Sequence, residues 1–439
     1  MKKFLRKILP ESFILWTHKI RGQLAARYYG YPAKKMVVIG VTGTNGKTTT
    51  VNLIAKILEE AGFKVGLAST INFKIGNKEW INKTKMTTLS PFVLQKMLSK
   101  MVKAGCEYAI IETTSHALTQ YRVWGISYDV AVLTNITPEH IEYHGSFEKY
   151  QKTKARLFES LKKSFHKPGV KKISILPQAD PSFSVFKDIP ADIKLTYRIG
   201  GQPRDSQEIV ARRIYLDMNG SSFEVATPYG DIQIKLKLPG RFNIMNALAA
   251  LAVGVSQNIS LSKIQKALEK VEMVPGRMEK IDEGQDFSVI VDFAHTPDAL
   301  QKIFETIKPV ARGRIISVLG ATGERDKFKR PILGALAGKY ADLVYVTNED
   351  PYHEDPQKII DAVAAGVSRG KKEKMIEGVN YFRILDRAEA IERAIKVAKK
   401  DDVVIITGKG GEHTMAVGDK KIPWDDGEIA RKVLKKLKK

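Results

Sequence analysis

The chain has 439 residues, of which 43% are hydrophobic and 27% are charged, with 72 Lys and Arg residues against 48 Asp and Glu residues. This length predicts two or three domains with well-packed cores, and it excludes a secreted mini-protein and an intrinsically disordered chain. No apolar run approaches the roughly 18 residues that span a bilayer. The single cysteine, Cys106, excludes a disulfide framework and a cysteine-rich zinc site, and it favours a reducing cytoplasm.

Much of the basic charge lies at the two ends of the sequence. The formal net charge is +24 at pH 7, and residues 1–35 and 431–439 contribute +8 and +6 of it. Such an excess is typical of proteins that bind nucleic acid, membrane surfaces or phosphorylated substrates, and also of a lysine-rich proteome. The sequence shows no nucleic-acid-binding motif, so we expect no nucleic-acid partner.

The first segment, residues 1–35, is predicted to form one basic amphipathic helix that ends at Gly30 and Pro32. Its apolar positions recur every three or four residues and share one stripe of a helix: Phe13, Trp16, Ile20 and Leu24. This helix is expected either to pack on the rest of the protein or to touch an anionic membrane surface. Packing is the favoured alternative, because Trp16 is followed by a tyrosine cluster at residues 28–31.

From residue 36 onward, short β-branched runs alternate with helical patterns, which is typical of parallel βαβ units with helices on both faces of a sheet. Strands are expected at residues 36–41, 64–70, 108–115 and 128–135, and helices near 47–61, 91–104, 246–255 and 261–270. Residues 208–238 differ, because short alternating strands and tight turns there predict an antiparallel insert or edge. These elements predict a central domain over residues 36–274.

A second alternating set follows, with strands expected at residues 288–294, 314–323, 342–350 and 402–410. In an open α/β sheet, the loops after the carboxyl ends of the strands form the ligand crevice. Here those loops are rich in charged and small polar residues. We therefore predict a ligand-carrying Rossmann-like domain over residues 275–439, and an α/β fold for the whole chain.

A glycine-rich loop at residues 40–49 follows the first strand and opens a helix. Glycines let the backbone fold around phosphates, while Lys47 can reach the β and γ phosphates and Thr48 can bind Mg²⁺. The spacing departs slightly from the strict P-loop, because Gly40 lies six residues before Gly46 rather than five. The loop nevertheless predicts a site for a nucleoside triphosphate with Mg²⁺.

Two neighbouring strand ends add a carboxylate and imidazoles. Glu112 ends one strand where a plain P-loop enzyme would carry an Asp, and His140 follows the next strand. Both are predicted metal or substrate ligands. For His116 and His144, a structural role and a functional role remain equally open.

These residues resemble those of the Mur ligases of peptidoglycan synthesis, in particular the MurE branch, which adds the third amino acid to UDP-N-acetylmuramoyl-L-alanyl-D-glutamate. The similar motifs run in order: GVTGTNGKTT (40–49), ETTSHALTQYR (112–122), TNITPEHIEYHG (134–145), GRFNIMNALAA (240–250), PGRMEKI (275–281), DFAHTPDAL (292–300), GERDKFKRP (323–331) and GKGGE (408–412). Several of them separate this branch from folylpolyglutamate and cyanophycin-type ligases. The resemblance implies a cytoplasmic, monomeric, ATP-dependent carboxylate–amine ligase that works through an acyl phosphate.

The resemblance also implies roles for individual positions. Catalytic roles fall on Lys47, Glu112, His140, Lys154 and Arg277. Two Mg²⁺ ions would be held by Thr48, Glu112, His140 and Lys154, the last of which family members carry as an N-carbamate. ATP contacts fall on Gly43, Thr44, Asn45, Gly46, Lys47, Thr48, Thr49, Asn243, Asn246, Asp292 and His295.

Two further groups would bind the other substrates. The muramoyl-peptide contacts fall on Thr87, Thr88, Thr114, Ser115, Gln120 and Arg122. The contacts to the incoming L-amino acid fall on Arg325, Glu349, Asp350, Tyr352, Gly408 and Glu412.

The sequence departs from the family in two places. Family members carry a UDP-binding domain before the P-loop, and the 35 residues here are too few for one. Either less surface holds UDP, or the carrier is a different one, such as a pseudomurein-type precursor, or another chain helps. Second, the D-N-P-R motif that selects meso-diaminopimelate is replaced by Glu-Asp-Pro-Tyr, so Tyr352 stands where the clamping arginine would be. We therefore expect a diamino acid or another L-amino acid, with lysine favoured over diaminopimelate.

Overall fold

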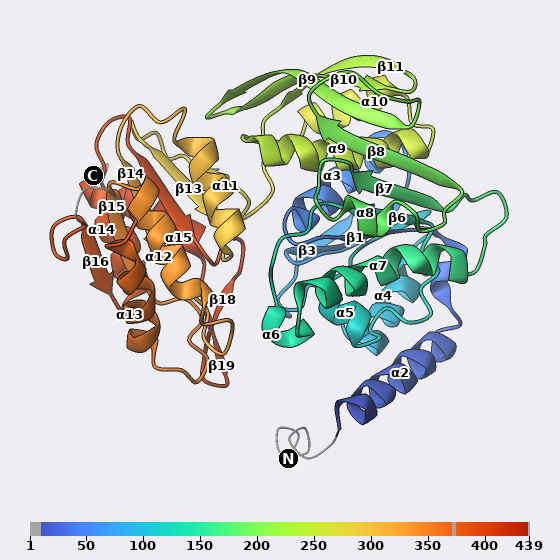
Figure 1. The fold of residues 1–439 in the computed structure, drawn as a ribbon, viewed down its shortest axis with the longest axis horizontal. Helices are drawn as coiled ribbons and strands as arrows, with labels where there is room; N and C mark the ends of the chain where they lie inside the picture. The colour runs from blue at the N-terminus through green and yellow to red at the C-terminus, as the bar shows by residue number, and fades with distance from the viewer. Residues whose placement is uncertain (1–9, 371–374, 438–439) are drawn as a thin grey trace. The chain divides into compact units, whose positions relative to one another are not determined.

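The computed structural model describes residues 10–370 and 375–437, which form two compact units (Figure 1). Unit 1 comprises Met1–Tyr215, Ser222–Leu236 and Phe242–Val271, and unit 2 comprises Leu216–Ser221, Lys237–Arg241 and Glu272–Lys439, each within the described residues. Two short segments of the strand-rich region thus belong to unit 2. The functional domain boundaries derived from the sequence stay predictions, because compactness alone defines these units.

Unit 1 is built on an eleven-stranded sheet in the order β11-β10-β9-β8-β7-β6-β1-β5-β2-β3-β4. Its strands are β1 (Val37–Thr42), β2 (Val65–Ala68), β3 (Asn72–Ile75), β4 (Lys78–Ile81), β5 (Tyr108–Glu112), β6 (Val130–Leu133), β7 (Ile173–Pro177), β8 (Ile193–Ile199), β9 (Glu208–Asp217), β10 (Gly220–Thr227) and β11 (Gly230–Leu236). The central strand β1 is parallel to both neighbours, with Val41 opposite Glu112 and Thr42 opposite Leu133. This register brings the carboxyl ends of β1, β5 and β6 to one edge of the sheet.

Helices cover both faces of this sheet. They are α3 (Lys47–Glu60), α4 (Pro91–Lys103), α5 (Ser115–Thr119), α6 (Ile141–His144), α7 (Phe147–Lys163), α8 (Phe183–Phe186), α9 (Arg241–Ser256) and α10 (Leu261–Glu269). On one face α3, α9 and α10 meet where Ile57 and Ile264 approach Gly254. On the other face α4, α5 and α7 share one apolar core with the central strands. The central strands β1, β5 and β6 are mainly apolar because both of their faces are buried.

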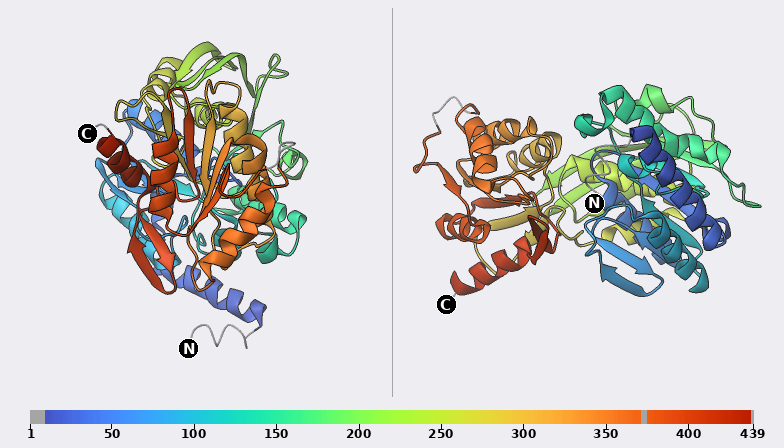
Figure 2. Two further views of the ribbon diagram at one scale, coloured as in Figure 1. Left: turned by 90° about the vertical axis from the view of Figure 1, so that its left-hand side faces the viewer. Right: turned by 90° about the horizontal axis from the view of Figure 1, so that it is seen from below.

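Unit 2 contains a six-stranded sheet in the order β12-β13-β17-β14-β15-β16, in which only β12 is antiparallel to its neighbour (Figure 2). Its elements are β12 (Glu279–Ile281), β13 (Ser288–Asp292), α11 (Pro297–Ile307), β14 (Ile315–Leu319), α12 (Lys329–Tyr340), β15 (Leu343–Thr347), α13 (Pro356–Val367), β16 (Tyr381–Ile384), α14 (Arg387–Val397), β17 (Val403–Thr407), β18 (Thr414–Val417), β19 (Lys420–Pro423) and α15 (Asp426–Leu437). The predicted α/β class, with a mostly parallel first sheet, an antiparallel part and a second Rossmann-like sheet, is confirmed.

Two local predictions in unit 1 need correction. The expected strand at residues 108–115 ends at Glu112, because Thr114 caps α5 by accepting a 3.2 Å hydrogen bond from the Ala117 amide. The β3–β4 hairpin was not predicted, because β4 is exposed along its whole length and lacks an apolar alternation. The first correction matters for the site, since it makes Glu112 the last residue of its strand.

The predicted N-terminal helix is shorter than expected and packs differently. It comprises α2 (Glu11–Tyr28), followed by a 3₁₀ turn, η1 (Pro32–Lys35); the part of the prediction at residues 1–9 lies outside the described residues. The expectation that the helix packs on the protein is confirmed, but Trp16, on which that expectation rested, is 56% exposed. The helix packs instead through small residues, and a Cβ on Gly22 would lie 2.7 Å from the Tyr121 carbonyl oxygen. Close approach of two backbones requires such residues.

Within the described residues, no helix has both the length and the apolar character needed to cross a membrane.

Candidate active site

The glycine-rich loop joins β1 to α3 at the edge where three parallel strands end. Gly43 and Gly46 have φ angles of 148° and 83°, a region in which residues with a side chain are strained. A Cβ on Gly43 would lie 1.9 Å from the Thr134 Oγ1, and one on Gly46 would lie 2.2 Å from the Asn246 Oδ1. Both positions therefore require glycine, and the loop leads directly into the amino end of α3, where backbone N–H groups favour an anion.

The side chains of Asn135, which follows β6, and Tyr150, in α7, hold the loop in place. The Asn45 amide donates a 3.0 Å hydrogen bond to the Asn135 Oδ1, and the Asn135 amide group donates one of 2.9 Å to the Asn45 carbonyl. The hydroxyls of Thr44 and Tyr150 lie 3.1 Å apart, within hydrogen-bonding distance. Neither Asn135 nor Tyr150 was predicted as a site residue, although Asn135 lies in a segment that resembles the family. The sequence could not show that Asn135 lies beside the loop, since 90 residues separate Asn45 from Asn135.

Thr48 and Glu112 meet as the predicted metal ligands. The Thr48 hydroxyl lies 3.0 and 3.2 Å from the two carboxylate oxygens of Glu112, and the Thr70 amide donates a 2.8 Å hydrogen bond to the same group. Glu112 is 1% exposed, and the Thr48 hydroxyl and the Thr70 amide that contact it are neutral donors. An anionic carboxylate and a hydroxyl are hard oxygen ligands that fit Mg²⁺, which commonly takes only one or two protein ligands beside phosphate oxygens and water.

A Mg²⁺ site at Thr48 and Glu112 does not require a cluster of several protein ligands. Among residues 10–370 and 375–437, no group of three or more His, Cys, Asp or Glu side chains is arranged to hold a metal ion. A cation at Glu112 would therefore rely on Thr48, phosphate oxygens and water.

Two lysines converge on the carbonyl of Gly43. The Lys47 ammonium donates hydrogen bonds of 3.0 and 2.7 Å to the Gly43 and Thr44 carbonyls, and the Lys154 ammonium donates one of 2.7 Å to Gly43. Lys154 is 2% exposed and lies over the Tyr150 ring at 4.5 Å. Burial, aided by the charge of Lys47, lowers the pKa of Lys154 well below its usual value. The loop therefore gathers positive charge while favouring a neutral amine at Lys154.

His140 lies in a cluster of imidazole and phenol rings. Its ring is 4.7 Å from that of His116, which stacks on Tyr143 at 4.1 Å, and it is 6.5 Å from the Tyr150 ring. Glu139 and Glu142 lie 3.6 and 3.7 Å from its ring nitrogens. The structure thus connects His140 to Lys154 through Tyr150, while Glu112 contacts Thr48.

His144 belongs to the same cluster and has a partner among the predicted substrate contacts. Its Nε2 lies 3.0 Å from the Ser115 hydroxyl. Burial, with a smaller contribution from the charge of Lys154, lowers the pKa of His144 to about 4. His144 is therefore neutral at physiological pH.

The predicted muramoyl-peptide contacts form one network beside Glu112. The Thr88 hydroxyl donates a 2.7 Å hydrogen bond to the Glu112 carbonyl and accepts one of 3.1 Å from the Thr114 amide. Arg122 donates to the Thr88 carbonyl at 3.0 Å and to the Gln120 side chain at 2.9 Å. Thr87 is connected to this network through Thr70. The hydroxyls of Thr70 and Thr87 lie 3.0 Å apart, and the Thr70 amide contacts Glu112. Residues far apart in the sequence thus come together next to the phosphate loop.

The predicted ATP contacts fall into two groups, one in each unit. In unit 1, the Asn246 amide donates a 3.1 Å hydrogen bond to Asn243. In unit 2, both carboxylate oxygens of Asp292 accept backbone N–H groups at 2.7 Å, from Met278 and Ala294. Burial raises the pKa of Asp292, against the opposing effect of Arg277.

Two further residues of the unit 2 group surround Phe293. The guanidinium of Arg277 lies 4.4 Å from the centre of the Phe293 ring, and the His295 Nδ1 lies 3.0 Å from the Phe293 carbonyl oxygen. Arg277, which precedes β12, therefore lies close to Asp292 and His295 at the carboxyl end of β13.

The predicted amino-acid contacts gather around a buried lysine that sequence reasoning missed. Lys409 has no exposed surface, and its ammonium lies 2.9 Å from the Asp350 carboxylate, 2.6 Å from that of Glu412 and 2.8 Å from the Thr414 carbonyl. Although burial opposes the charge, the two carboxylates raise the pKa of Lys409 to about 12. Lys409 therefore stays charged and fixes both carboxylates.

A third carboxylate in this group is positioned by a glycine. The Thr322 hydroxyl donates a 2.6 Å hydrogen bond to Glu349, and Gly408 has a φ angle of 110°. A Cβ at Gly408 would lie 2.4 Å from the other Glu349 oxygen, so the carboxylate occupies the space of a missing side chain.

Tyr352 and Arg325 also belong to this group, since the charges of Asp350, Glu412 and Arg325 act on the Tyr352 hydroxyl. Burial raises the pKa of the Tyr352 hydroxyl above its usual value. The residue that replaces the clamping arginine of the motif thus lies near another arginine.

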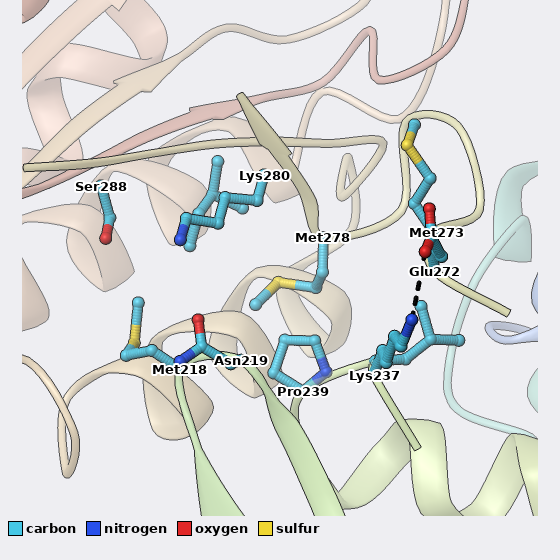
Figure 3. Close-up of a pocket in the computed structure, with 11 residues that line it drawn as sticks. Met218, Asn219, Lys237, Pro239, Glu272, Met273, Met278, Lys280 and Ser288 are labelled. Atoms are coloured by element: carbon cyan, nitrogen blue, oxygen red, sulfur yellow. Dashed lines mark hydrogen bonds and ion pairs between the residues drawn. The ribbon is translucent and has the colours of Figure 1, made fainter. Parts of the chain in front are cut away.

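A cavity of about 370 Å³ in unit 2 borders the Asp292 group, because Met278, whose amide contacts Asp292, is among its lining residues (Figure 3). Met218, Met273 and Met278 contribute to its walls, and the ion pair of Lys237 with Glu272, at 3.1 Å, lies at its margin. None of its lining residues is a predicted site residue, so the cavity is not assigned to the chemistry.

Comparison with known proteins gives a consistent result. The Mur ligase middle domain matches residues 41–254, and the Mur ligase, glutamate ligase domain matches residues 276–410. A UDP-N-acetylmuramyl-tripeptide synthetase of Roseiflexus sp. (strain RS-1) is 42% identical over 424 residues, which cover 94% of this chain and 81% of that protein. A UDP-N-acetylmuramoyl-L-alanyl-D-glutamate–2,6-diaminopimelate ligase of Geobacillus thermodenitrificans (strain NG80-2) is 41% identical, with the same coverage.

Solved structures show the same architecture. A structure of a UDP-N-acetylmuramoyl-L-alanyl-D-glutamate–2,6-diaminopimelate ligase is 29% identical, with a TM-score of 0.63, over 96% of this chain and 84% of that one. A folylpolyglutamate synthase of Mycobacterium tuberculosis, 17% identical with a TM-score of 0.68 over 89% of this chain and 92% of that one, shares the fold alone. The two matching domains and the identity to full-length relatives show that this chain belongs to the Mur ligase family of ATP-dependent ligases.

Proposed function

We propose that this protein adds a diamino acid to the D-glutamyl γ-carboxylate of UDP-N-acetylmuramoyl-L-alanyl-D-glutamate, in the synthesis of peptidoglycan precursors in the cytoplasm. The observation that carries the proposal is the convergence of the phosphate loop, the Thr48–Glu112 pair and the Thr88–Arg122 network at one edge of the first sheet. The names of relatives that are about 40% identical support the substrate class.

The reaction first brings together two anions, ATP and the substrate carboxylate. It then joins an amine to the activated acyl group. The γ-phosphoryl group of ATP moves to the carboxylate, which gives an acyl phosphate and ADP. The amine nitrogen then attacks the carbonyl carbon, phosphate leaves, and the amine loses a proton. Both steps depend on neutralising negative charge and on alignment, so the loop with the Lys47 ammonium is suited to the first step. Mg²⁺, when bound, would neutralise phosphate oxygens, and Thr48 and Glu112 would hold it.

We further propose that Lys154 works as an N-carbamate and that two Mg²⁺ ions bind, with His140 as a ligand of the second. Carbamate formation needs a neutral amine, which attacks carbon dioxide and releases one proton. Burial and the neighbouring Lys47 favour that neutral form. The product is an anion that would relieve the repulsion between the two lysines and would attract a cation.

The carbamate is testable without activity. Protein incubated with ¹³C-bicarbonate is expected to show a carbamate carbon resonance in its ¹³C NMR spectrum, which a Lys154→Arg variant lacks. A spectrum identical in both proteins contradicts the carbamate but leaves the ligase assignment intact.

For the incoming amino acid we propose L-lysine rather than meso-diaminopimelate. The loops of unit 2 present three carboxylates, those of Glu349, Asp350 and Glu412, and Tyr352 cannot form the charged bidentate contact that a distal carboxylate needs. This arrangement suits a distal ammonium. Relatives of this chain are named as 2,6-diaminopimelate ligases, so the proposed amino acid differs from the one in their names.

One assay tests the function and the amino acid together. ATP-dependent phosphate release is measured with UDP-N-acetylmuramoyl-L-alanyl-D-glutamate and single amino acids, and the product mass is determined. Release with lysine supports both proposals, whereas a clear preference for meso-diaminopimelate overturns the choice of lysine alone. No release with any diamino acid contradicts the proposed carrier or reaction, and a pseudomurein-type carrier would then be tried.

A further inference from the structure

Helix α2 has apolar residues on two opposite faces, and only one of these faces is covered. The covered face consists of small residues, with Ala25 and Ala26 fully buried and Gly22 against the segment at Tyr121–Trp124. The opposite face carries the large side chains: Phe13 is 45% exposed, Trp16 56%, Leu24 54% and Tyr28 76%, and Ile20 lies between them. Figures 1 and 2 show α2 at the margin of unit 1.

The spacing makes these exposed side chains one continuous surface. Positions 13, 16, 20, 24 and 28 follow one another at intervals of three or four residues, which places them within one stripe. The rings of Phe13 and Trp16 lie 5.7 Å apart, and those of Tyr28 and Tyr29 lie 4.9 Å apart. Because the small-residue face fixes the helix to unit 1, the stripe is held facing outward. We call these five residues the α2 stripe.

The surroundings of the α2 stripe are positively charged. Lys19, Arg21 and Arg27 are exposed on the same helix, and no Asp or Glu occurs in the sequence from Ser12 to Leu58. The basic surface continues beyond the helix, where the Lys34 ammonium lies 4.9 Å from the centre of the half-exposed Phe165 ring.

We propose that the α2 stripe binds the surface of a membrane that contains anionic phospholipids. A helix with aromatic and aliphatic residues on one side and Lys or Arg beside them suits the boundary between headgroups and acyl chains, where apolar burial and attraction to anionic lipids act together. Trp and Tyr are enriched at that boundary. A second copy of the chain is a poor occupant, because it would bring an equally basic helix against this one. The proposal goes beyond the ligase function and does not depend on it.

The test is co-sedimentation of the full-length protein with two kinds of vesicles. One kind contains phosphatidylcholine with phosphatidylglycerol, and the other contains phosphatidylcholine alone. We expect binding to the anionic vesicles that weakens as salt screens the charges. A Trp16→Ser/Leu24→Ser double variant is expected to bind at least about tenfold more weakly. The matched control is Tyr215→Ser/Tyr229→Ser, which removes two equally exposed side chains from the strand-rich part of the chain and should bind like the wild type.

A second variant separates charge from apolar burial. Lys19→Gln/Arg21→Gln/Arg27→Gln keeps the α2 stripe and is expected to lose most of the preference for anionic vesicles. Thermal melting followed by circular dichroism checks that each variant folds like the wild type. Fluorescence gives an independent readout, since the wild type, but not a Trp16→Phe variant, should show a blue shift when anionic vesicles are added.

Three results would overturn the proposal. The first is no binding of the wild type to anionic vesicles at low salt. The second is equal binding by the wild type and the folded Trp16→Ser/Leu24→Ser variant. The third is self-association in analytical ultracentrifugation that this variant abolishes, without vesicle binding, which would make a second copy the occupant.

Discussion

The phosphate loop of unit 1 and the cluster of three carboxylates in unit 2 carry opposite charges. The loop carries the Lys47 ammonium beside the buried Lys154 amine, both on the carbonyl of Gly43, and it is built mainly from glycines and backbone in one continuous segment. The unit 2 group gathers three carboxylates from separate loops and balances two of them with the buried Lys409. In the proposed function, the loop would bind phosphate, a group shared by every nucleotide, whereas the side chains of unit 2 would set which amino acid is used.

Removing a charge from the phosphate loop tests its role most directly. A Lys47→Ala variant is expected to lose at least about a thousandfold in kcat/KM, because a charge aimed at the transferring phosphoryl group is lost in a preorganised site. ATP-dependent phosphate release measures the effect. The control is Lys56→Ala, an exposed lysine on the same helix, which should keep wild-type activity. An active Lys47→Ala enzyme would mean that the loop is not the phosphoryl-transfer site.

A second change tests whether Lys409 organises the unit 2 group. A Lys409→Met variant leaves Asp350 and Glu412 without their shared cation, so we expect a loss of about 3 kcal/mol in the free energy of unfolding. Urea unfolding measures the loss, and the KM for the amino acid should rise more than the KM for ATP. Lys400→Met, at an exposed position, is the control. Unchanged stability and KM would show that the carboxylates do not need Lys409.

A third change tests whether unit 2 sets the amino acid. A Tyr352→Arg variant restores the charged fork of the D-N-P-R motif, so the ratio of activities with meso-diaminopimelate and L-lysine should shift toward diaminopimelate by about 10- to 100-fold. Competition between the two amino acids, read by product mass, measures the ratio. A Tyr352→Phe variant, which also loses the phenol but gains no charge, should not produce this shift. If both variants behave alike, the charge at this position does not decide the substrate.

The smallest expected effect concerns the protonation of His144. Its pKa is lowered from 6.5 to about 4 in the folded protein, so between these values the unfolded chain binds more protons than the folded one. Stability therefore falls as the pH decreases through this window. After allowance for the partial exposure of the ring, the loss is about 1 kcal/mol.

Comparison with a His144→Asn variant isolates this contribution. Urea unfolding at pH 7.5 and pH 4.5 should show a wild type that loses about 1 kcal/mol more than the variant on acidification. An equal loss in both proteins would show that His144 is as easily protonated in the folded state as in the unfolded one.

The sequence predicted features whose signals are local. The first strand, the phosphate loop and α3 form one continuous segment with glycine at fixed positions, and Glu112 and the loops of unit 2 were recognised by their place after apolar runs. Lys409 was missed because a lysine in a glycine-rich loop is usually a surface residue, and only the fold shows that two carboxylates surround it.

The periodicity of the sequence also could not show which face of α2 packs on unit 1. Periodicity identifies the large apolar side chains, but helices pack closely through small ones. Gly22, Ala25 and Ala26 contribute little to an apolar pattern, yet they allow the backbone to approach unit 1. The choice between two apolar faces depends on the shape of the partner surface, which a single sequence does not contain.

The edge of the first sheet has a consequence for solubility. A sheet of eleven strands ends in open hydrogen-bonding groups, which can pair with the edge of another molecule and seed aggregates. One of its two edge strands, opposite β11, is β4, which is only four residues long and begins with Lys78 and Glu79. A short edge with exposed charges of both signs is a poor template for a further strand. The hairpin that the sequence did not reveal therefore protects this edge of the sheet from pairing with another molecule.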